Sequence, residues 1–491
     1  MTDVRFDLLW PEFLVAGLAF VVFTADLFLP SARKNLLAVV AIVGMAAILA
    51  FTLWFLWGVD ESLFGGLVQV DAYALFFQAL FLGIGGFVVA VSYHYVGKHL
   101  THPGEYYGII LLSVLAMMLL AAAGELLTAY VSLELLSFSL YILAGYASRD
   151  PKSNEASVKY ILLGAFSSGL LLYGIVLLYG ALGTTVFTEM AQALQGTDGM
   201  NGRLLLGLAF LVSGLGFKLA AVPFHMWAPD VYEGAPLPIT AYIAVGSKAA
   251  AFALVLRLFA EGLLPAADQW RPMIAGLAAV TMVFGNLVAL VQRNIKRMLA
   301  YSSVGQVGYM LMGIAALSTL ASNGLMLHLV GYAVTNLVAF GAIIAFYNAS
   351  GKDEIPDFAG LAARSPFLAA ALTVALFSLA GLPFFAGFTT KFYLFAAVAQ
   401  GGYLWLAGVA ITASLVSLYY YLMVVRQMYI ETGDDVSAIR APRLLVAALG
   451  ALVLAVVAIG LYPAPLVEAV EAASRALLAG GGLALAAPPL P

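Results

Sequence analysis

The 491-residue sequence contains no cysteine and few charged residues. Without cysteine the chain can form no disulfide and cannot ligate an iron–sulfur cluster through thiolates. None of its five histidines stands in a CxxCH or HExxH motif, so neither a haem nor a catalytic zinc site is expected. No Walker loop and no GxGxxG motif opening a βαβ unit is present. These absences leave protons or small ions as the species on which the chain acts.

Charged residues make up only 10% of the sequence, whereas a soluble domain carries about 25%. Hydrophobic residues make up 63% and recur in segments of roughly 20 residues, long enough to span a bilayer as helices. The net charge of −4 and the lack of a basic run argue against nucleic acid as a partner. The composition therefore predicts an all-α polytopic membrane protein in a lipid bilayer.

We predict about fourteen transmembrane helices. The expected boundaries are 8–29, 36–57, 70–94, 107–124, 126–147, 158–181, 203–222, 237–260, 271–292, 297–317, 323–347, 366–397, 403–427 and 443–462. The first span carries Glu12 and Asp26 and does not resemble a cleaved signal peptide. Beyond residue 463 we expect a surface tail or an interfacial piece.

The basic residues predict the orientation of these helices. Most of the 22 lysines and arginines lie in or beside loops that follow odd-numbered helices, including the cluster RNIKR (293–297), which we interpret as a topology anchor. By the positive-inside rule these loops face the cytoplasm, and both termini lie outside. We therefore expect a multi-pass protein of the bacterial cytoplasmic (inner) membrane with periplasmic termini.

Two pairs of stretches indicate an internal repeat. AYVSLELLSFSLYILAG (129–145) resembles AYSSVGQVGYMLMGIAA (300–316), and VPFHMWAPDVY (222–232) resembles LPFFAGFTTKFY (382–393). Because each copy would hold five helices, an odd number, the second copy must be inverted in the membrane. The predicted segments are a three-helix segment (1–106), a first repeat (107–260), an inverted second repeat (271–427) and a last helix with an apolar tail (428–491).

Each repeat contains a proline inside an expected helix. Pro223 removes the helical partner of the Leu219 carbonyl, and Pro383 does the same to Leu379. Freed backbone groups at membrane depth must be buried in protein or face water. Broken helices at matching positions, here helices 7 and 12, indicate an ion pathway, whereas a plain kink is the alternative for either proline alone.

Several ionisable residues lie within the spans, where each needs a partner, water or a function. The candidates for a proton path are Glu134 in helix 5, Lys159 in helix 6, Lys218 in helix 7, Lys248 in helix 8 and Lys391 in helix 12. For each the structural alternative is a protonated carboxyl that packs or a lysine that snorkels to the surface.

Other polar residues near these sites have two interpretations. His225 follows the first break, where either a bond to a carbonyl or a proton relay fits. His328, near the start of helix 11, favours a structural role over a relay. Asp230 and Glu233 flank the first broken helix on the cytoplasmic side and either collect protons or solvate a loop.

The electrostatic energies limit how such a chain of sites could move protons. A Glu–Lys pair about 7 Å apart is worth roughly 2.4 kcal/mol at an effective dielectric constant of about 20. Moving one proton against about 150 mV costs roughly 3.5 kcal/mol. Opening one ion pair is therefore too weak, and we expect several coupled sites to titrate as a group.

Four motifs give the sequence a specific resemblance. They are VSLELLSFSLYILAGY (131–146), GFKLAAVPFHMWAPDVYEGAP (216–236), NIKRMLAYSSVGQVGYMLMG (294–313) and GLPFFAGFTTKFYLF (381–395). In this order they resemble the subunit N family of the proton-translocating NADH:quinone oxidoreductase, respiratory complex I. The KFYLF that begins at Lys391 favours subunit N over the related subunits L and M.

The resemblance implies roles for particular positions. The family's functional glutamate and lysines fall on Glu134, Lys218, Lys248, Lys391 and Lys159. Relatives often have a histidine where this chain has Gln306, so a relay at that position cannot use an imidazole here. His328 matches no family residue.

The resemblance also implies a membrane-arm subunit whose proton channel couples quinone reduction in partner subunits to proton translocation. NADH, FMN, iron–sulfur clusters and quinone would bind to those partners, and this non-redox translocase subunit would bind no cofactor or metal. Expected partners are the antiporter-like subunits M and L, the small subunits K and J and, indirectly, the peripheral arm. The alternatives are a subunit of an Mrp-type cation/proton antiporter, of a membrane-bound hydrogenase or of a ferredoxin oxidoreductase, and a purely structural scaffold.

Overall fold

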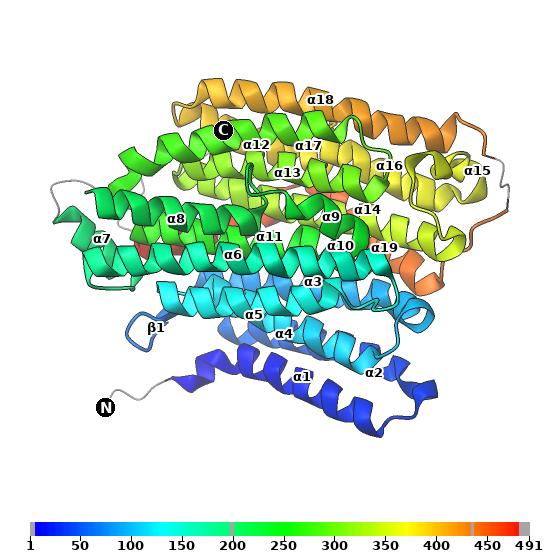
Figure 1. Ribbon diagram of the computed structural model, residues 1–491, viewed down its shortest axis with the longest axis horizontal. Coiled ribbons are helices and arrows are strands. Elements are labelled where there is room, and N and C mark those ends of the chain that lie inside the picture. The colour runs from blue at the N-terminus through cyan, green and yellow to red at the C-terminus, as the bar shows by residue number, and fades with distance from the viewer. Residues whose placement is uncertain (1–4, 197–200, 434–436, 481–491) are drawn as a thin grey trace.

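The structure is a computed structural model that describes residues 5–196, 201–433 and 437–480, which form a bundle of helices lying side by side (Figure 1). Twelve helices in these ranges are long and apolar enough to cross a membrane. Two further predicted crossings are α13 (Ile295–Ala315) and the interrupted pair α16 (Pro366–Ala380) and α17 (Ala386–Gln400). The prediction of an all-α polytopic membrane protein is confirmed.

The remaining long elements follow the predicted order. The N-terminal part contains α1 (Trp10–Phe28), α2 (Asn35–Phe51), α3 (Ala72–His99), α4 (Pro103–Ala122), α5 (Leu126–Ala144), α6 (Pro151–Leu182), α8 (Gly202–Leu219) and α9 (Trp227–Gly234). The C-terminal part contains α10 (Leu237–Tyr242), α11 (Lys248–Arg257), α12 (Ala267–Ala289), α14 (Thr319–Ser350), α15 (Leu361–Arg364), α18 (Leu404–Tyr429) and α19 (Arg443–Leu461). A π-helical turn, Ile243–Ser247, joins α10 to α11 into one crossing.

Polar residues fix where several of these apolar helices begin. The carboxylate of Asp71 accepts a hydrogen bond from the Ala74 amide at the start of α3, and the Asn294 side chain accepts from the first amides of α13. Such caps satisfy N–H groups that have no partner within the helix. The apolar runs thus form the spans, and the short polar stretches between them set their limits.

Several short elements between the spans were not predicted. The strands β1 (Glu61–Leu63) and β2 (Val68–Val70) form an antiparallel hairpin between α2 and α3, and α7 (Phe187–Gln195) is a short helix between α6 and α8. The segment expected as a tail forms α20 (Ala464–Gly480), which packs against α3 and α14. Residues 481–491 of the predicted tail lie outside the described residues.

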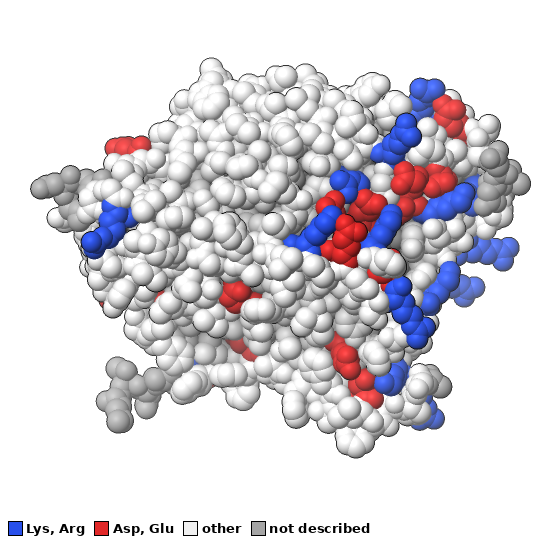
Figure 2. Space-filling view, viewed as in Figure 1, with Lys and Arg blue, Asp and Glu red and all other residues white. Residues whose placement is uncertain are grey.

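Charged side chains gather at one end of the bundle, which we call the charged end (Figure 2). This end carries α15 and the loops that follow α1, α5 and α12, whereas the hairpin and α7 lie at the opposite end (Figure 1). The surface between the two ends is almost free of charge in this view. Such an uncharged belt is what a bilayer-spanning surface requires.

A buried cluster of charges ties helices together at the opposite end. The guanidinium of Arg257 donates to both carboxylate oxygens of Asp71 at 2.8 and 2.9 Å and to Glu261 at 2.9 Å. Its Nε donates to the carbonyl of Ala121 at 3.1 Å, so the cluster joins α3, α4 and α11. Because Arg257 is only 1% exposed, removing either carboxylate would leave a buried charge with less compensation.

Glycines allow α12 and α13 to cross in close contact. A Cβ added to Gly285 would lie 2.5 Å from the amide nitrogen of Gly305 and 2.9 Å from the carbonyl oxygen of Tyr301. Between membrane helices, small residues permit such an approach, and packing then supplies much of the association energy. The crossing matters for the site below because α13 carries several of its polar residues.

We expect Gly285→Leu to destabilise the protein by about 1–3 kcal/mol, because the new side chain has to force two backbones apart. The control is Gly276→Leu on the same helix, where an added Cβ would meet nothing within 4 Å. Thermal unfolding of the purified protein in detergent would measure the difference. Equal midpoints for the two variants would show that the close crossing contributes nothing to stability.

Candidate functional site

The first predicted break is present in helix 7. Helix α8 ends at Leu219, Ala220 adopts a left-handed backbone conformation with φ of 61°, and α9 begins only at Trp227. The indole of Trp227 donates to the carbonyl of Phe217 at 2.8 Å. A side chain thus satisfies one of the backbone groups near the end of α8.

The second predicted break separates α16 from α17. The chain leaves α16 through Gly381, whose φ is 86°, and Phe384 also has a positive φ of 74°. An added Cβ at Gly381 would lie 3.2 Å from Cδ and 3.6 Å from Nζ of Lys391. This position therefore requires glycine for its backbone conformation and for the close approach of the lysine.

The carbonyl freed by the second break is a polar junction. Leu379, which the sequence predicts to lose its helical partner to Pro383, accepts a hydrogen bond from Lys391 Nζ at 2.7 Å. The same carbonyl accepts from Gln306 Nε2 of α13 at 3.2 Å. The interruption of the helix thus supplies a backbone dipole that faces an ammonium group.

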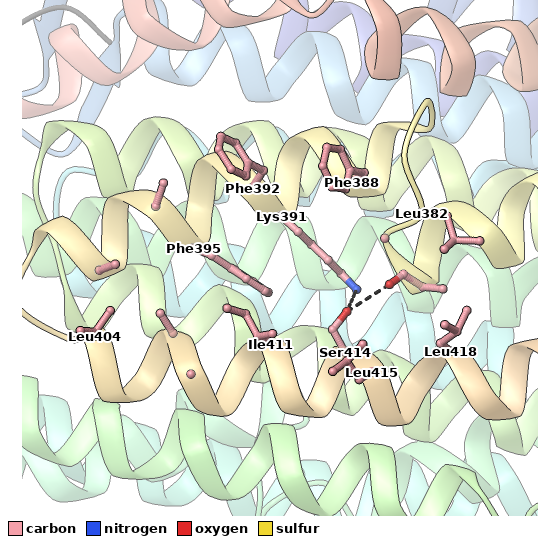
Figure 3. A pocket seen from close by; sticks show the side chains of 16 residues that line it. Leu382, Phe388, Lys391, Phe392, Phe395, Leu404, Ile411, Ser414, Leu415 and Leu418 are labelled. Carbon is pink, nitrogen blue, oxygen red and sulfur yellow. Dashed lines mark hydrogen bonds between the residues drawn. The ribbon is translucent and has the colours of Figure 1, made fainter. Parts of the chain in front are cut away.

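Lys391 lies on α17, points toward α18 and is 4% exposed (Figure 3). Besides the Leu379 carbonyl, its Nζ donates to Ser414 Oγ of α18 at 3.0 Å. The ammonium also lies 4.9 Å from the centre of the Tyr309 ring, within the range of a cation–π contact. Among the described residues, no carboxylate forms an ion pair with it.

Lys218 lies in the last turn of α8 and is 6% exposed. Its ammonium donates to the hydroxyl of Ser137 and lies 3.3 Å from the Tyr141 hydroxyl, both on α5. The Tyr141 ring centre is 5.5 Å from Nζ. Hydroxyl and aromatic groups of the neighbouring helix therefore solvate this charge.

Glu134 lies on α5, one helical turn before Ser137, and is half-buried. Its carboxylate accepts a hydrogen bond from Ser168 of α6 and lies within electrostatic reach of Lys218. In the described part of the chain these two groups form no direct ion pair, and the α5 groups that Lys218 contacts are Ser137 and Tyr141. The predicted Glu–Lys pair is thus a longer-range electrostatic interaction.

Lys248 is the centre of a buried hydroxyl cluster and is 1% exposed. Its ammonium donates to Ser303 of α13, whose Oγ also lies 3.3 Å from the Tyr232 hydroxyl and 2.9 Å from the Tyr332 hydroxyl. These groups come from α9, α11, α13 and α14, and the π-helical turn immediately before Lys248 is of a kind common at functional sites.

A further set of polar contacts runs from α13 to α17. Gln306, one turn after Ser303, places Oε1 3.2 Å from Nε2 of His328, and Nδ1 of His328 lies 3.0 Å from the hydroxyl of Thr390. Thr390 directly precedes Lys391 in the sequence. His328, for which the sequence favours a structural role, therefore occupies the middle of this polar set.

The two halves of the candidate site are separated by aromatic side chains. The ring of Tyr160 packs edge-on against Tyr141 at 4.7 Å and stacks on Trp227 at 4.5 Å. Within the described residues, no continuous chain of direct hydrogen bonds joins Lys218 to Lys248. Lys218 thus bonds to groups of α5, whereas Lys248, His328 and Lys391 bond to groups of α13, α16, α17 and α18.

Lys159 lies in a different setting, in an ionic network at the charged end. Its side chain is 41% exposed and pairs with Glu155 and Asp230, each at 2.6 Å. Arg297 pairs with Asp230 at 2.7 Å and with Glu233 at 3.0 Å. A cavity of about 170 Å³ opens among these groups. Lys159 is therefore a surface residue beside the candidate path rather than one of its deep members.

His225 lies in the first break but outside the hydrogen-bonded groups. The ring is buried, packs edge-on against Phe284 at 4.7 Å, and its Nδ1 has no hydrogen-bond partner among the described residues. The structure therefore gives His225 no contact with the deep lysines.

The sequence did not single out the hydroxyl groups that complete the site. Ser137, Ser303, Thr390 and Ser414 each lie within hydrogen-bond distance of a buried lysine or histidine. Serine and threonine are common in membrane helices, so only their position beside the broken helices or in the repeated stretches could have marked them. Within the described ranges no group of three or more His, Asp or Glu side chains could hold a metal ion.

Comparisons with known proteins show which family this chain resembles. Residues 123–417 match the family described as NADH:quinone oxidoreductase/Mrp antiporter, TM. The chain is 45% identical to NADH-quinone oxidoreductase subunit N of Moorella thermoacetica, over 94% of this chain and 96% of that protein. It is similar to a chain of respiratory complex I from Thermus thermophilus with bound aureothin, with 32% identity, a TM-score of 0.81 and coverage of 94% and 99%. It is also similar to a chain of the archaeal membrane-bound sulfane sulfur reductase, with 26% identity, a TM-score of 0.85 and coverage of 96% and 97%.

The glycine at the second break provides a test of how tightly Lys391 is held. Gly381→Ala and Gly402→Ala both place a side chain at a φ of 86°, which costs about 1–2 kcal/mol at either position. Only Gly381→Ala also presses on Lys391, because an added Cβ at Gly402 meets nothing within 4 Å. We expect the thermal midpoint to fall further for Gly381→Ala. A larger fall for Gly402→Ala would contradict the close packing described here.

Proposed function

Since the chain belongs to the NADH:quinone oxidoreductase/Mrp antiporter family, and within it to the subunit N members, we propose that it conducts protons in the membrane arm of an NADH:quinone oxidoreductase. The observation that carries this proposal is a set of buried lysines that form no direct ion pair with any carboxylate of the described residues and bond instead to hydroxyls and to a carbonyl freed by a helix break. Such lysines can gain and lose protons without breaking an ion pair.

In the second repeat, Lys248 and Lys391 would hold protons on Nζ, and hydroxyls would lie beside both. Ser303 accepts from Lys248 and can pass a proton on through the Tyr232 or Tyr332 hydroxyl. Gln306 cannot titrate, so it would orient the His328 ring and the Leu379 carbonyl rather than carry a proton.

In the first repeat, Lys218 would be a loading site whose proton affinity Glu134 controls through its charge. Glu134 is half-buried on a face of α5 that also exposes Val131 and Phe138. We propose that a neighbouring membrane subunit packs on this face, so that a change in that subunit reaches Lys218 through Glu134. The small subunits K and J are candidates, and subunits M and L would pack elsewhere along the arm.

The proposal assigns the redox chemistry to partner chains. NADH, FMN, iron–sulfur clusters and quinone would bind there, and this chain has no cysteine that could ligate a cluster. The chain itself would then be a non-redox subunit of a translocase. We further propose that residues 107–260 and 271–427 are the two inverted repeats, flanked by 1–106 and 428–491, with each repeat supplying one broken helix. The surface network of Lys159, Asp230 and Arg297 would lie at the proton-uptake side.

We expect Lys218→Ala to slow proton pumping at least ten-fold, because the substitution removes the loading site together with its interaction with Glu134, worth roughly 2.4 kcal/mol. Pumping is measured in vesicles, alongside NADH:quinone reductase activity and an assembly check. The control is Lys352→Ala, because Lys352 is 63% exposed and its ion pair with Asp357 at 3.4 Å should contribute little. Full pumping by an assembled Lys218→Ala complex would favour the structural-scaffold alternative.

The orientation can be tested because the chain has no cysteine, so each introduced cysteine is unique. We propose a bacterial inner-membrane location with the charged end in the cytoplasm and both termini outside. A membrane-impermeant maleimide should then label Arg203→Cys in intact cells but label Lys352→Cys only after the membrane is opened. The reverse pattern would invert the topology.

The fold is not confined to complex I, since a chain of the archaeal membrane-bound sulfane sulfur reductase is also similar to this one. The greater identity to the subunit N relative favours the respiratory assignment. Purification of the native complex decides between these assignments. Co-purification with NADH-oxidising subunits supports the respiratory assignment, whereas isolation with small antiporter subunits or with a hydrogenase module overturns it.

A further inference from the structure

A cavity of about 610 Å³ lies between α17 and α18, next to the second break (Figure 3). Side chains such as Phe388, Phe392 and Leu415 make its wall almost entirely apolar. The polar side chains on the wall are Lys391 and Ser414, and no acidic residue lines it. The cavity thus combines a hydrocarbon-like wall with one ammonium group.

The ammonium group in this wall lacks a counter-charge. Lys391 uses two of its three N–H groups on the Leu379 carbonyl and the Ser414 hydroxyl, which are neutral. No carboxylate of the described residues pairs with it. A charge in apolar surroundings gains strongly from an anion, so the cavity is electrostatically complementary to an anionic headgroup.

The cavity faces the outside of the bundle. Phe392 on α17 is 62% exposed and Leu415 on α18 is 67% exposed, and both line the cavity. In a membrane this surface meets hydrocarbon, so a ligand arriving from the bilayer must itself be largely apolar. A long-chain carboxylic acid meets both conditions, because its neutral form is soluble in hydrocarbon and its ionised form pairs with an ammonium group.

We propose that this cavity binds a single-chain anionic amphiphile of the fatty-acid class, with the carboxylate on Lys391 Nζ and the alkyl chain between α17 and α18. If the acid arrives protonated and Lys391 is neutral, the O–H bond breaks and an N–H bond forms, which leaves the same ion pair. If Lys391 is already protonated, the carboxyl proton returns to water. The proposed binding site does not depend on the proposed function. The consequence of binding does rest on that function: the carboxylate–ammonium pair would hold a proton at Lys391 and inhibit pumping.

The test uses the purified intact complex in lipid vesicles, a photoactivatable palmitic acid, and the matching photoactivatable hexadecanol as a neutral control. We expect the acid to label peptides of α17 and α18 at least fivefold more than the alcohol does. Lys391→Met should abolish this preference. Equal labelling by acid and alcohol, or cross-linking of these peptides to a neighbouring subunit in place of the acid, would overturn the proposal.

A matched glycine pair tests the cavity itself. Gly408→Leu on α18 fills the cavity from a position where an added Cβ meets nothing within 4 Å, and Gly276→Leu on α12 is equally unobstructed but lies outside it. Labelling by the acid should fall at least fivefold in Gly408→Leu and stay unchanged in Gly276→Leu. If Gly408→Leu does not accumulate, Ile411→Trp on the same wall replaces it. Undiminished labelling in the filled variant would refute the site.

Pumping is measured in the same vesicles with and without palmitate, each variant being compared with itself. If palmitate inhibits pumping and Gly408→Leu relieves this inhibition, the result supports both the binding site and the role of Lys391. Labelling at the site without inhibition would keep the binding proposal and count against proton transfer at Lys391, so the two proposals can fail separately.

Discussion

The compensation of buried charge is the constraint on which this structure depends, and the chain meets it in two ways. Arg257 is enclosed by Asp71 and Glu261 in charge-assisted hydrogen bonds at 2.8–2.9 Å, and removing one partner of such a buried pair costs about 3–5 kcal/mol. Lys218, Lys248 and Lys391 are bonded to hydroxyls or carbonyls, which stabilise an ammonium group but do not fix its charge. The first arrangement suits a structural tie between helices, and the second suits groups whose protonation changes.

The helix breaks follow from the same constraint. A continuous α16–α17 helix would direct the Leu379 carbonyl to an amide four residues later, but Pro383 has no N–H to offer. The carbonyl instead accepts from Lys391 and Gln306, so the helix loses a backbone bond where two side chains need an acceptor. Gly381 makes this possible, since its φ of 86° turns the chain and its missing Cβ leaves room for the lysine.

The sequence could predict the spans, the two breaks and the deep lysines because each contrasts with its surroundings: apolar runs against polar loops, proline inside a helix, charge inside an apolar run. It could not predict the partners of those lysines, because Ser303 and Ser414 come from helices distant in the sequence and resemble many other serines. Lys159 lies near the start of the helix predicted from 158, so the sequence left open whether it joins the proton path or snorkels to the cytoplasmic surface. The helix in fact begins at Pro151, and Lys159 meets Asp230 of α9 at the surface. Helix α20 was not predicted because the Gly- and Pro-rich end that follows it favoured the interpretation of the whole segment after residue 463 as a tail.

The separation of the site into two groups limits how the groups can act on each other. Lys218 and Glu134 lie on one side of the stacked rings of Tyr160 and Trp227, and Lys248 with its hydroxyl cluster lies on the other. Without a continuous hydrogen-bond path through the described residues, the direct influence between the groups is electrostatic, and at an effective dielectric of about 20 each such interaction is worth only a few kcal/mol. For a pair about 7 Å apart it is roughly 2.4 kcal/mol, which is less than the roughly 3.5 kcal/mol needed to move one proton against about 150 mV. A charge change at Glu134 therefore has to be combined with a rearrangement of the aromatic stack or of α9 before Lys248 and Lys391 can respond fully.

Helix α9 contributes to three parts of the candidate site. It carries Trp227 in the aromatic stack, Tyr232 in the hydroxyl cluster and Asp230 in the surface network, so it is the element through which these three parts could be coupled.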